Sequence, residues 1–282
     1  MIAFSVWKID IYRYWIFYVL GFLIAYMFFY ILAKKKVFFK YPKIHLLLDK
    51  YLDDLILYSA LWVLIWWRLW HILIYDLSYY IENPIELFQF RKGWMSFIGW
   101  MIWVFIALII FAKKRKLGKS DLILIFDLVL VIAPFGIMLG RIWNFLNQEL
   151  YGIVVPYNFR WLNNWIINLF KKLNVFHIYD KVDNFLRINT NILASFFEWL
   201  LLLFVTLMIL NGFIKKWVYR IWYITWFFLV WYSLVRFLLE YLRVDSQSEF
   251  IFYLSKSQRF FVVFFILWLY FLLRKSQKIS IK

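Results

Sequence analysis

Long apolar runs are the feature that most constrains the fold of this chain. Of its 282 residues, 66% are hydrophobic and 25% aromatic, whereas a soluble domain is about 45–50% apolar. A helix needs about 20 apolar residues to cross a hydrocarbon core. We therefore predict an all-α, polytopic membrane protein with about seven transmembrane helices and a single integral membrane domain over residues 1–282. The predicted spans are residues 15–33, 55–74, 95–112, 122–139, 192–211, 222–239 and 260–273.

The formal net charge of +17 follows the predicted spans. Basic residues concentrate in alternate connections, whereas the short connection between the second and third spans carries only Arg91 and Lys92. The positive-inside rule then predicts an external N-terminus, a cytoplasmic C-terminus and an external or interfacial arm over residues 140–190. We favour this topological interpretation over a nucleic-acid partner. The predicted cytoplasmic basic runs begin at Lys34, Lys113, Lys215 and Arg274.

A polar cluster occupies residues 140–152, directly against the fourth predicted span. It contains Arg141, Asn144, Asn147, Gln148 and Glu149. Such groups are costly near hydrocarbon unless they serve a polar or anionic ligand. Helical spacing places Arg141 and Glu149 on one face, and arginine with amide donors suits a phosphate diester. The alternative is a capped helix end that stops at Gly152.

The sixth predicted span ends with four polar side chains on one helical face. Tyr232, Arg236, Glu240 and Arg243 follow an i, i+4, i+8, i+11 spacing. Arg236 and Glu240 can neutralise each other as an ion pair, or they can line an interior pathway. Arg243 is a surplus cation on the same face and favours a nearby anion.

Other charges within the spans have two open interpretations. Arg68, Glu198 and Asp127 lie inside apolar runs, where each could contact a ligand or satisfy a neighbouring helix. The chain contains no cysteine, so it offers neither a thiolate metal ligand nor a cysteine nucleophile. Any thiol that reacts must come from a partner.

At these residues the chain resembles the prolipoprotein diacylglyceryl transferases. The family pattern is approximately G-R-x-G-N-F-x-N-x-E-x-x-G, and Trp143 replaces its internal glycine. The matching residues are Gly140, Arg141, Asn144, Phe145, Asn147, Glu149 and Gly152. The family also has similar residues at Tyr14, Arg68, Ser96, Glu198, Tyr232, Arg236, Glu240 and Arg243.

The resemblance implies a multi-pass enzyme of the bacterial cytoplasmic membrane, without metal or cofactor. It would transfer a diacylglyceryl group from phosphatidylglycerol to the lipobox cysteine of a precursor protein. Arg141 and Arg236 would hold the phosphate, Glu240 would fix Arg236, and Tyr14 would line the pocket. Asn144 and Glu149 would orient the headgroup. The further expected substrate-binding residues are Asn147, Gly152, Arg68, Glu198, Arg243 and Ser96.

One departure from the family leaves a second function open. The family has M-S-F-H-G-G where this chain has Met95-Ser96-Phe97-Ile98-Gly99-Trp100, so Ile98 replaces a histidine usually given a central part in the reaction. The alternative is a catalytically inactive relative that binds phospholipid or lipoprotein signal segments and could act as a subunit of a membrane assembly. A transporter is a third and weaker interpretation, because no internal repeat is evident.

Overall fold

The computed structural model describes residues 2–6, 9–61, 97–155, 164–244, 250–251, 254–274 and 278–281. The chain divides into two compact units. One comprises Met1–Ala25 and Phe126–Ile281, and the other comprises Tyr26–Ile125 and Lys282. The single integral membrane domain stays a prediction.

The described part of the chain is mostly helical, which confirms the expected class. The long helices are α1 (Arg13–Lys34), α5 (Phe97–Lys114), α6 (Lys119–Leu146), α9 (Leu201–Lys216), α10 (Tyr223–Glu240) and α11 (Lys256–Leu273). Three described helical stretches are long and apolar enough to cross a membrane, namely Lys119–Leu146, Thr190–Lys216 and Tyr223–Glu240. Val19–Lys34 and Phe261–Leu273 are shorter apolar helices. Residues 62–74 of the second predicted span lie outside the described residues, so the number seven stays a prediction.

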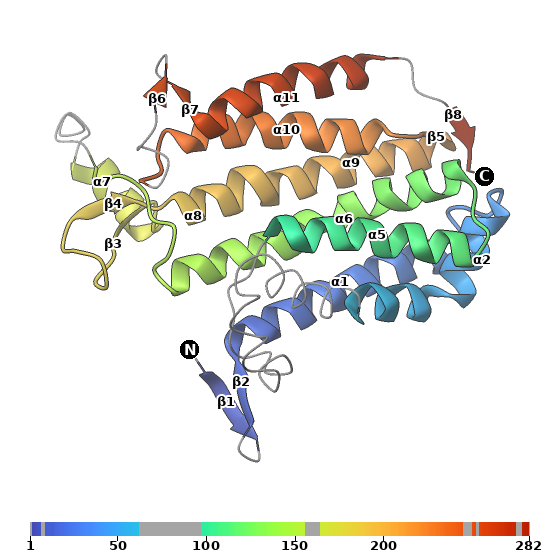
Figure 1. The fold of residues 1–282 in the computed structure, drawn as a ribbon, viewed down its shortest axis with the longest axis horizontal. Helices are drawn as coiled ribbons and strands as arrows, with labels where there is room; N and C mark the ends of the chain where they lie inside the picture. Colours follow the sequence, from blue (N-terminus) through green and yellow to red (C-terminus); the bar gives the residue numbers. More distant parts are fainter. Residues whose placement is uncertain are drawn as a thin grey trace, which may run out of the picture. The chain divides into compact units, whose positions relative to one another are not determined.

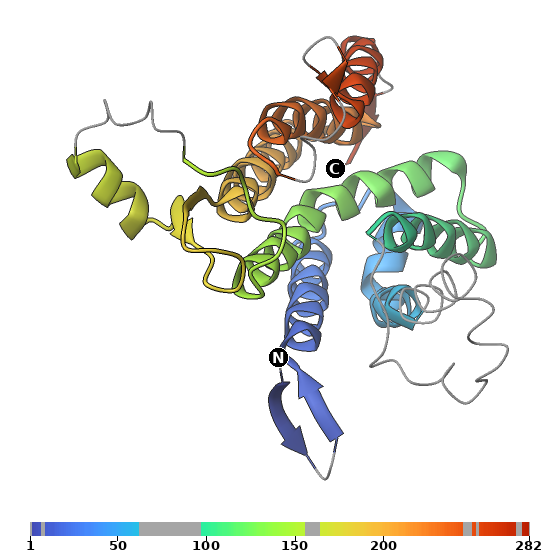
Figure 2. The same cartoon turned by 60° about the vertical axis from the view of Figure 1, so that its left-hand side comes forward.

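The core of the first unit lies among α6, α9 and α10, which run alongside one another (Figure 1). Trp199, Leu202 and Phe228 form a buried cluster, and Ile137 and Met138 of α6 pack against it. Helix α11 packs on α10 through aromatic stacking, with the Trp226 ring 5.6 Å from that of Trp268 and 4.8 Å from that of Phe271. The two views agree that α10 and α11 are neighbours (Figure 2).

The helix that carries Glu198 contains a π-helical segment. It begins as α8 (Thr190–Leu193), continues as η3 (Ala194–Leu200) and then becomes α9. The Leu201 N–H donates to the Phe196 carbonyl five residues earlier, which is the π-helical pattern. Such segments are rare and frequently occur at functional sites. Nothing in the apolar sequence pattern predicted this one.

The described residues also contain four two-stranded antiparallel sheets, which the all-α prediction did not include. The pairs are β1 (Ile2–Val6) with β2 (Ile9–Tyr12), β3 (Phe176–Ile178) with β4 (Leu186–Ile188), β5 (Val218–Arg220) with β8 (Lys278–Ser280), and β6 (Phe250–Ile251) with β7 (Leu254–Ser255). These strands have two to five residues, too few for a reliable alternating pattern. They pair the backbone groups of segments that lie between helices or near the two ends of the chain.

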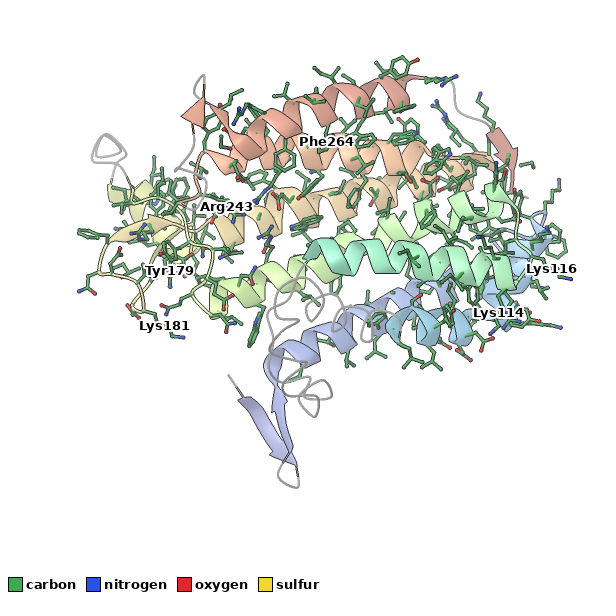
Figure 3. The ribbon with its side chains drawn as sticks, viewed as in Figure 1. Lys114, Lys116, Tyr179, Lys181, Arg243 and Phe264 are labelled. Carbon is green, nitrogen blue, oxygen red and sulfur yellow. The ribbon has the colours of Figure 1, made fainter. Side chains whose placement is uncertain are left out.

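The second unit contains a short amphipathic helix beside basic residues. Helix α2 (Pro42–Lys50) buries Ile44, Leu47 and Leu48. Arg115, just after α5, forms an ion pair with Asp54 and lies 3.8 Å from the Tyr51 ring centroid. Figure 3 labels two lysines in this region, Lys114 and Lys116.

Candidate functional site

Four charged side chains from three helical segments meet in the first unit. Glu198 of η3 lies between two arginines, with Oε2 3.9 Å from Arg141 Nη2 of α6 and Oε1 3.6 Å from Arg236 Nη1 of α10. Arg236 Nη2 also lies 3.1 Å from Glu240 Oε2, one turn along α10. We call Arg141, Glu198, Arg236 and Glu240 the charged cluster. The predicted pair of arginines therefore shares one carboxylate.

The charged cluster is buried, and a further arginine lies close to it. The Glu198 side chain is 0% exposed, and those of Arg236 and Arg141 are 13% and 17% exposed. Arg243, also buried, lies within electrostatic range of Arg141. Among the described side chains, the charged cluster and Arg243 together comprise three guanidinium groups and two carboxylates, which sum to one formal positive charge. A monoanionic group would balance that charge in a medium where unbalanced charge is costly.

Local structure explains why these side chains converge. Arg141 lies in the last two turns of α6, which continues past Pro134 to Leu146. Arg236 and Glu240 are four residues apart on α10, so they lie on the same face. Glu198 reaches the cluster from the π-helical segment. Extra backbone width in a π-turn alters the direction of the side chains that follow it.

Glu198 is held only loosely by its two arginines. Charge-assisted hydrogen bonds usually have N···O distances of about 2.7–2.9 Å, and both Glu198 ion pairs are longer than that. Within the described part of the chain, neither carboxylate oxygen of Glu198 has a hydrogen-bond partner. A buried carboxylate in this state is costly. The arginines therefore retain donors that an incoming anion can use.

Aromatic side chains border the charged cluster. The Tyr232 ring lies 5.5 Å from the Trp199 ring and 6.0 Å edge-on from Phe261 of α11. Tyr232 also interacts electrostatically with Glu198 and Arg236. The sequence placed Tyr232 on the same face as Arg236, and the structure confirms that placement.

Gly152 lies where three separate segments cross. Its N–H donates to the Ile188 carbonyl at 3.1 Å, and the next N–H, of Ile153, donates to the Leu242 carbonyl at 2.9 Å. Gly152 also forms an antiparallel bridge with Arg243. A Cβ at Gly152 would lie 2.4 Å from the Ile188 oxygen. Glycine is therefore required by close backbone approach, and it fixes the segment that carries Arg243.

The arm between α6 and α8 contains α7 (Asn164–Lys172) and the β3–β4 hairpin. Figure 3 places Arg243 near this arm, at the same end as Tyr179 and Lys181. Arg187 Nε donates to both Asp183 oxygens at 3.2 and 3.1 Å, and Nη1 donates to the Gly152 carbonyl at 3.0 Å. Hydrogen bonding from Arg187 holds the pKa of Asp183 below its ordinary value. Burial raises the pKa of Tyr179.

The polar cluster at residues 140–152 only partly meets the sequence expectation. Helix α6 ends at Leu146, and Gln148 and Leu150 have positive φ angles of 62° and 51°. Glu149 therefore lies beyond the helix, and the prediction that it shares a helical face with Arg141 was wrong. Its exposed side chain accepts from Asn147 Nδ2 at 3.3 Å. Asn144 is on α6 and partly buried.

Some predicted residues have no described side chain. Tyr14 lies in the first turn of α1 and Ile98 in the first turn of α5, but neither side chain is described. Arg68 and Ser96 lie outside the described residues. Among the residues that the structure does describe, no group of three or more His, Asp or Glu side chains could hold a metal ion.

The structure resolves the open interpretation of Asp127. This side chain is 0% exposed and accepts from Trp222 N at 2.8 Å and from Thr225 N at 2.9 Å. The Thr225 hydroxyl donates to the same carboxylate. Asp127 therefore satisfies a neighbouring helix, as one of the two sequence interpretations stated. Its partners are almost a hundred residues away in the chain, so no local sequence pattern indicated them.

Comparison with known proteins identifies the family. A sequence model of the prolipoprotein diacylglyceryl transferases matches residues 1–274. The chain is 33% identical over 151 residues to the phosphatidylglycerol–prolipoprotein diacylglyceryl transferase of Bordetella parapertussis, covering 54% of each chain. It is 37% identical over 153 residues to the protein of that name from Wolbachia pipientis, again covering 54% of each. The chain spans about half the length of the relatives it matches. Because the family model covers nearly its whole length, this chain belongs to the prolipoprotein diacylglyceryl transferase family.

Proposed function

We propose that this protein transfers a diacylglyceryl group from phosphatidylglycerol to the lipobox cysteine of precursor proteins. The observation that carries the proposal is the buried charged cluster, in which Arg141 and Arg236 share Glu198 at 3.9 and 3.6 Å. The phosphate of phosphatidylglycerol is a monoanion, so it balances the one surplus positive charge. Family membership supports the same substrate class.

Arg141 and Arg236 are proposed to hold the headgroup phosphate. A guanidinium group donates in parallel pairs and keeps its charge when buried, which suits a phosphate diester. Glu240, 3.1 Å from Arg236, would keep that arginine oriented. Asn144 would orient the headgroup from α6, and Tyr14 would line the lipid site. Arg243, Arg68, Ser96, Glu149, Asn147, Gly152 and Glu198 complete the proposed substrate-binding set.

The proposed reaction substitutes sulfur for oxygen at a glycerol carbon. The cysteine loses its proton to water, and its thiolate attacks the carbon that bears the phosphate. A carbon–sulfur bond forms while the carbon–oxygen bond breaks, and glycerol phosphate leaves with the bonding electron pair. The two arginines would stabilise the negative charge that develops on the departing phosphate.

The isoleucine at position 98 bears on the rate of this reaction. Isoleucine cannot accept a proton, and a general base typically contributes about 10²- to 10⁴-fold. A free cysteine with a pKa near 8.5 is already a few per cent thiolate at about pH 7. Nearby guanidinium groups increase that fraction. Slow transfer is therefore physically feasible without the histidine.

Ile98 also favours a second candidate, a non-catalytic relative that binds phospholipid or a lipoprotein signal segment. Such a protein would keep the charged cluster and lack turnover. Trp100 supports this candidate, because it fills a position where the family has glycine. The two candidates share the lipid site and differ only in chemistry.

We propose that the protein is a multi-pass protein of the bacterial cytoplasmic membrane with seven spans, an external N-terminus and a cytoplasmic C-terminus. Basic residues at Lys215, Lys216 and Arg220 lie at the end of α9 and in β5, away from the charged cluster at the opposite ends of α9 and α10. This arrangement supports a site at the outer side. The arm would then face the precursor protein.

The deciding experiment incubates the purified protein with phosphatidylglycerol and a lipobox peptide. Transfer predicts that the peptide gains the mass of one diacylglyceryl group, and that the Arg236→Gln variant gives no gain. Retention of phosphatidylglycerol without any gain supports the binding relative. If the parent is inert and Ile98→His restores transfer, lost catalysis is established. Failure to bind either phosphatidylglycerol or the lipobox peptide contradicts both candidates.

A further inference from the structure

Helix α10, which carries Arg236 and Glu240, begins without a cap of its own. Its N-cap residue is Trp222, which has a left-handed φ of 69° and makes no side-chain cap hydrogen bond. The first turn of a helix exposes N–H groups without intrahelical partners. Two of these donors, from Trp222 and Thr225, bind Asp127 of α6 instead.

Asp127 acts as a cap supplied by another helix. Its carboxylate accepts hydrogen bonds from Trp222 N, Thr225 N and the Thr225 hydroxyl, and the Tyr219 side chain also interacts with it. A negative charge at a helix N-terminus also interacts favourably with the helix dipole. An isolated buried carboxylate would be strongly unfavourable. The contact therefore specifies one position of α10 along α6.

This contact and the charged cluster lie at opposite ends of the same pair of helices. Asp127 and Arg141 are 14 residues apart on α6, a rise of about 21 Å, and fall on similar faces. Thr225 and Arg236 are 11 residues apart on α10, a rise of about 16 Å, and also share a face. The two helices run in the same direction. Fixing the axial position of α10 against α6 at the Asp127 end therefore also sets the relative positions of Arg141 and Arg236 at the other end.

We infer that Asp127 is a positioning residue that sets the axial register of α10 against α6 and thereby the spacing of Arg141 and Arg236. The apolar side chains that α6 packs against the cluster of Trp199, Leu202 and Phe228 specify register poorly, because Leu130, Ile137 and Met138 resemble one another in size and polarity. A slip of α10 by one turn, about 5.4 Å, would separate the donors from Asp127. It would also displace Arg236 from Glu198.

The register is measurable without any assay of function. The chain has no cysteine, so spin labels can be attached at introduced cysteines alone. Leu146 at the end of α6 and Leu238 on α10 are 48% and 55% exposed, and Leu146→Cys with Leu238→Cys forms the reporter pair. The distance distribution is then recorded by pulsed electron paramagnetic resonance for the full chain in lipid nanodiscs.

Matched variants separate positioning from general stability. Asp127→Ala removes the carboxylate and with it every acceptor contact to α10. Thr225→Val removes only the hydroxyl of Thr225, which Thr225→Ser retains. Asp121→Asn is the control, because Asp121 is buried on the same helix but caps α6 itself by accepting from Gly118 N at 2.7 Å. We expect Asp127→Ala to shift or broaden the distance distribution, Thr225→Val to do so less, and both Thr225→Ser and Asp121→Asn to match the parent.

The consequence for turnover rests on the proposed function. A buried donor left unpaired costs enough to change an equilibrium by about tenfold or more, so we expect kcat for Asp127→Ala to fall at least that much. An unchanged distance distribution in folded Asp127→Ala overturns the inference, even if the variant is less stable. If the parent does not catalyse transfer but Asp127→Ala still shifts the distance distribution, the role of Asp127 in register is established and only the proposed function fails.

Discussion

Replacing Gly152 by alanine is expected to destabilise the protein and to displace Arg243. The new Cβ would lie 2.4 Å from the Ile188 oxygen, 2.7 Å from the Leu242 oxygen and 2.9 Å from Thr190 Cγ2. At least one backbone segment must therefore move. Moving Ile188 away would stretch its 3.1 Å hydrogen bond with the Gly152 N–H, which is already near the normal limit.

The expected cost combines two terms. Overpacking costs about 1–3 kcal/mol, and a buried backbone group without its partner costs about 1–3 kcal/mol. The sum predicts a loss of about 2–6 kcal/mol in the free energy of unfolding. Thermal unfolding followed by circular dichroism in a mild detergent would measure the loss. Phosphatidylglycerol binding should weaken in the protein that remains folded, because Arg243 is bridged to Gly152.

Gly140→Ala is the matched control for this prediction. Gly140 lies on α6 beside Arg141, and a Cβ there would meet nothing within 4 Å. Alanine in a helix is favoured over glycine by about 0.5–1 kcal/mol, so this variant should be as stable as the parent or slightly more stable. The reasoning about close approach is refuted if Gly152→Ala unfolds at the parent's temperature and binds lipid equally well.

Three further predictions address charge. Arg236→Gln should cost about 3–5 kcal/mol of stability by leaving buried carboxylates uncompensated. Adding Glu240→Gln should recover part of that stability but no lipid binding. A double-mutant cycle would measure the coupling, and full additivity of the two substitutions would contradict the pairing. Ile98→His should raise the rate of transfer by about 10²- to 10⁴-fold, measured by mass spectrometry of the peptide. If the parent is active and the variant has the same rate, the general base is elsewhere. Arg187 lowers the folded-state pKa of Asp183. The contribution of Asp183 to the stability of the β3–β4 hairpin should therefore be present above about pH 4 and be lost as the pH falls through that lowered pKa. Amide hydrogen exchange would detect the opening of the hairpin, and Asp183→Asn should remove the pH dependence.

The sequence predicted those site residues whose relation is local. Arg236 and Glu240 are one turn apart, so helical spacing alone indicated their pairing. The apolar runs likewise predicted the long helices to within a few residues in most cases. Both signals depend only on neighbours along the chain.

Contacts between distant segments were not predictable in the same way. Glu198 was recognised as a charge within a span, but its position between Arg141 and Arg236 depends on a π-helical segment and on the packing of three helices. Asp127 was ambiguous for the same reason. The two interpretations differ only in tertiary contacts, which one sequence does not contain.

The misassigned residue has a specific physical cause. The prediction for Glu149 extended the helical period through residues 147–150, but Gln148 and Leu150 adopt left-handed backbone conformations without being glycine. Tertiary hydrogen bonds stabilise this turn, because Asn191 Nδ2 donates to the Glu149 carbonyl at 2.6 Å and the Thr190 hydroxyl to the Leu150 carbonyl at 2.8 Å. Both donors come from the start of α8, about 40 residues later in the chain.

Native mass spectrometry of the protein released from mixed phospholipid nanodiscs tests the central claim most directly. The parent should retain phosphatidylglycerol in preference to phosphatidylethanolamine, whose headgroup has no net charge to balance the positive charge of the charged cluster together with Arg243. Arg141→Gln and Arg236→Gln should each lose that preference, whereas Arg115→Gln, which breaks the ion pair with Asp54, should keep it. Equal retention of both lipids by the parent, or an unchanged preference in both arginine variants of the charged cluster, would contradict the assignment of this site to an anionic headgroup.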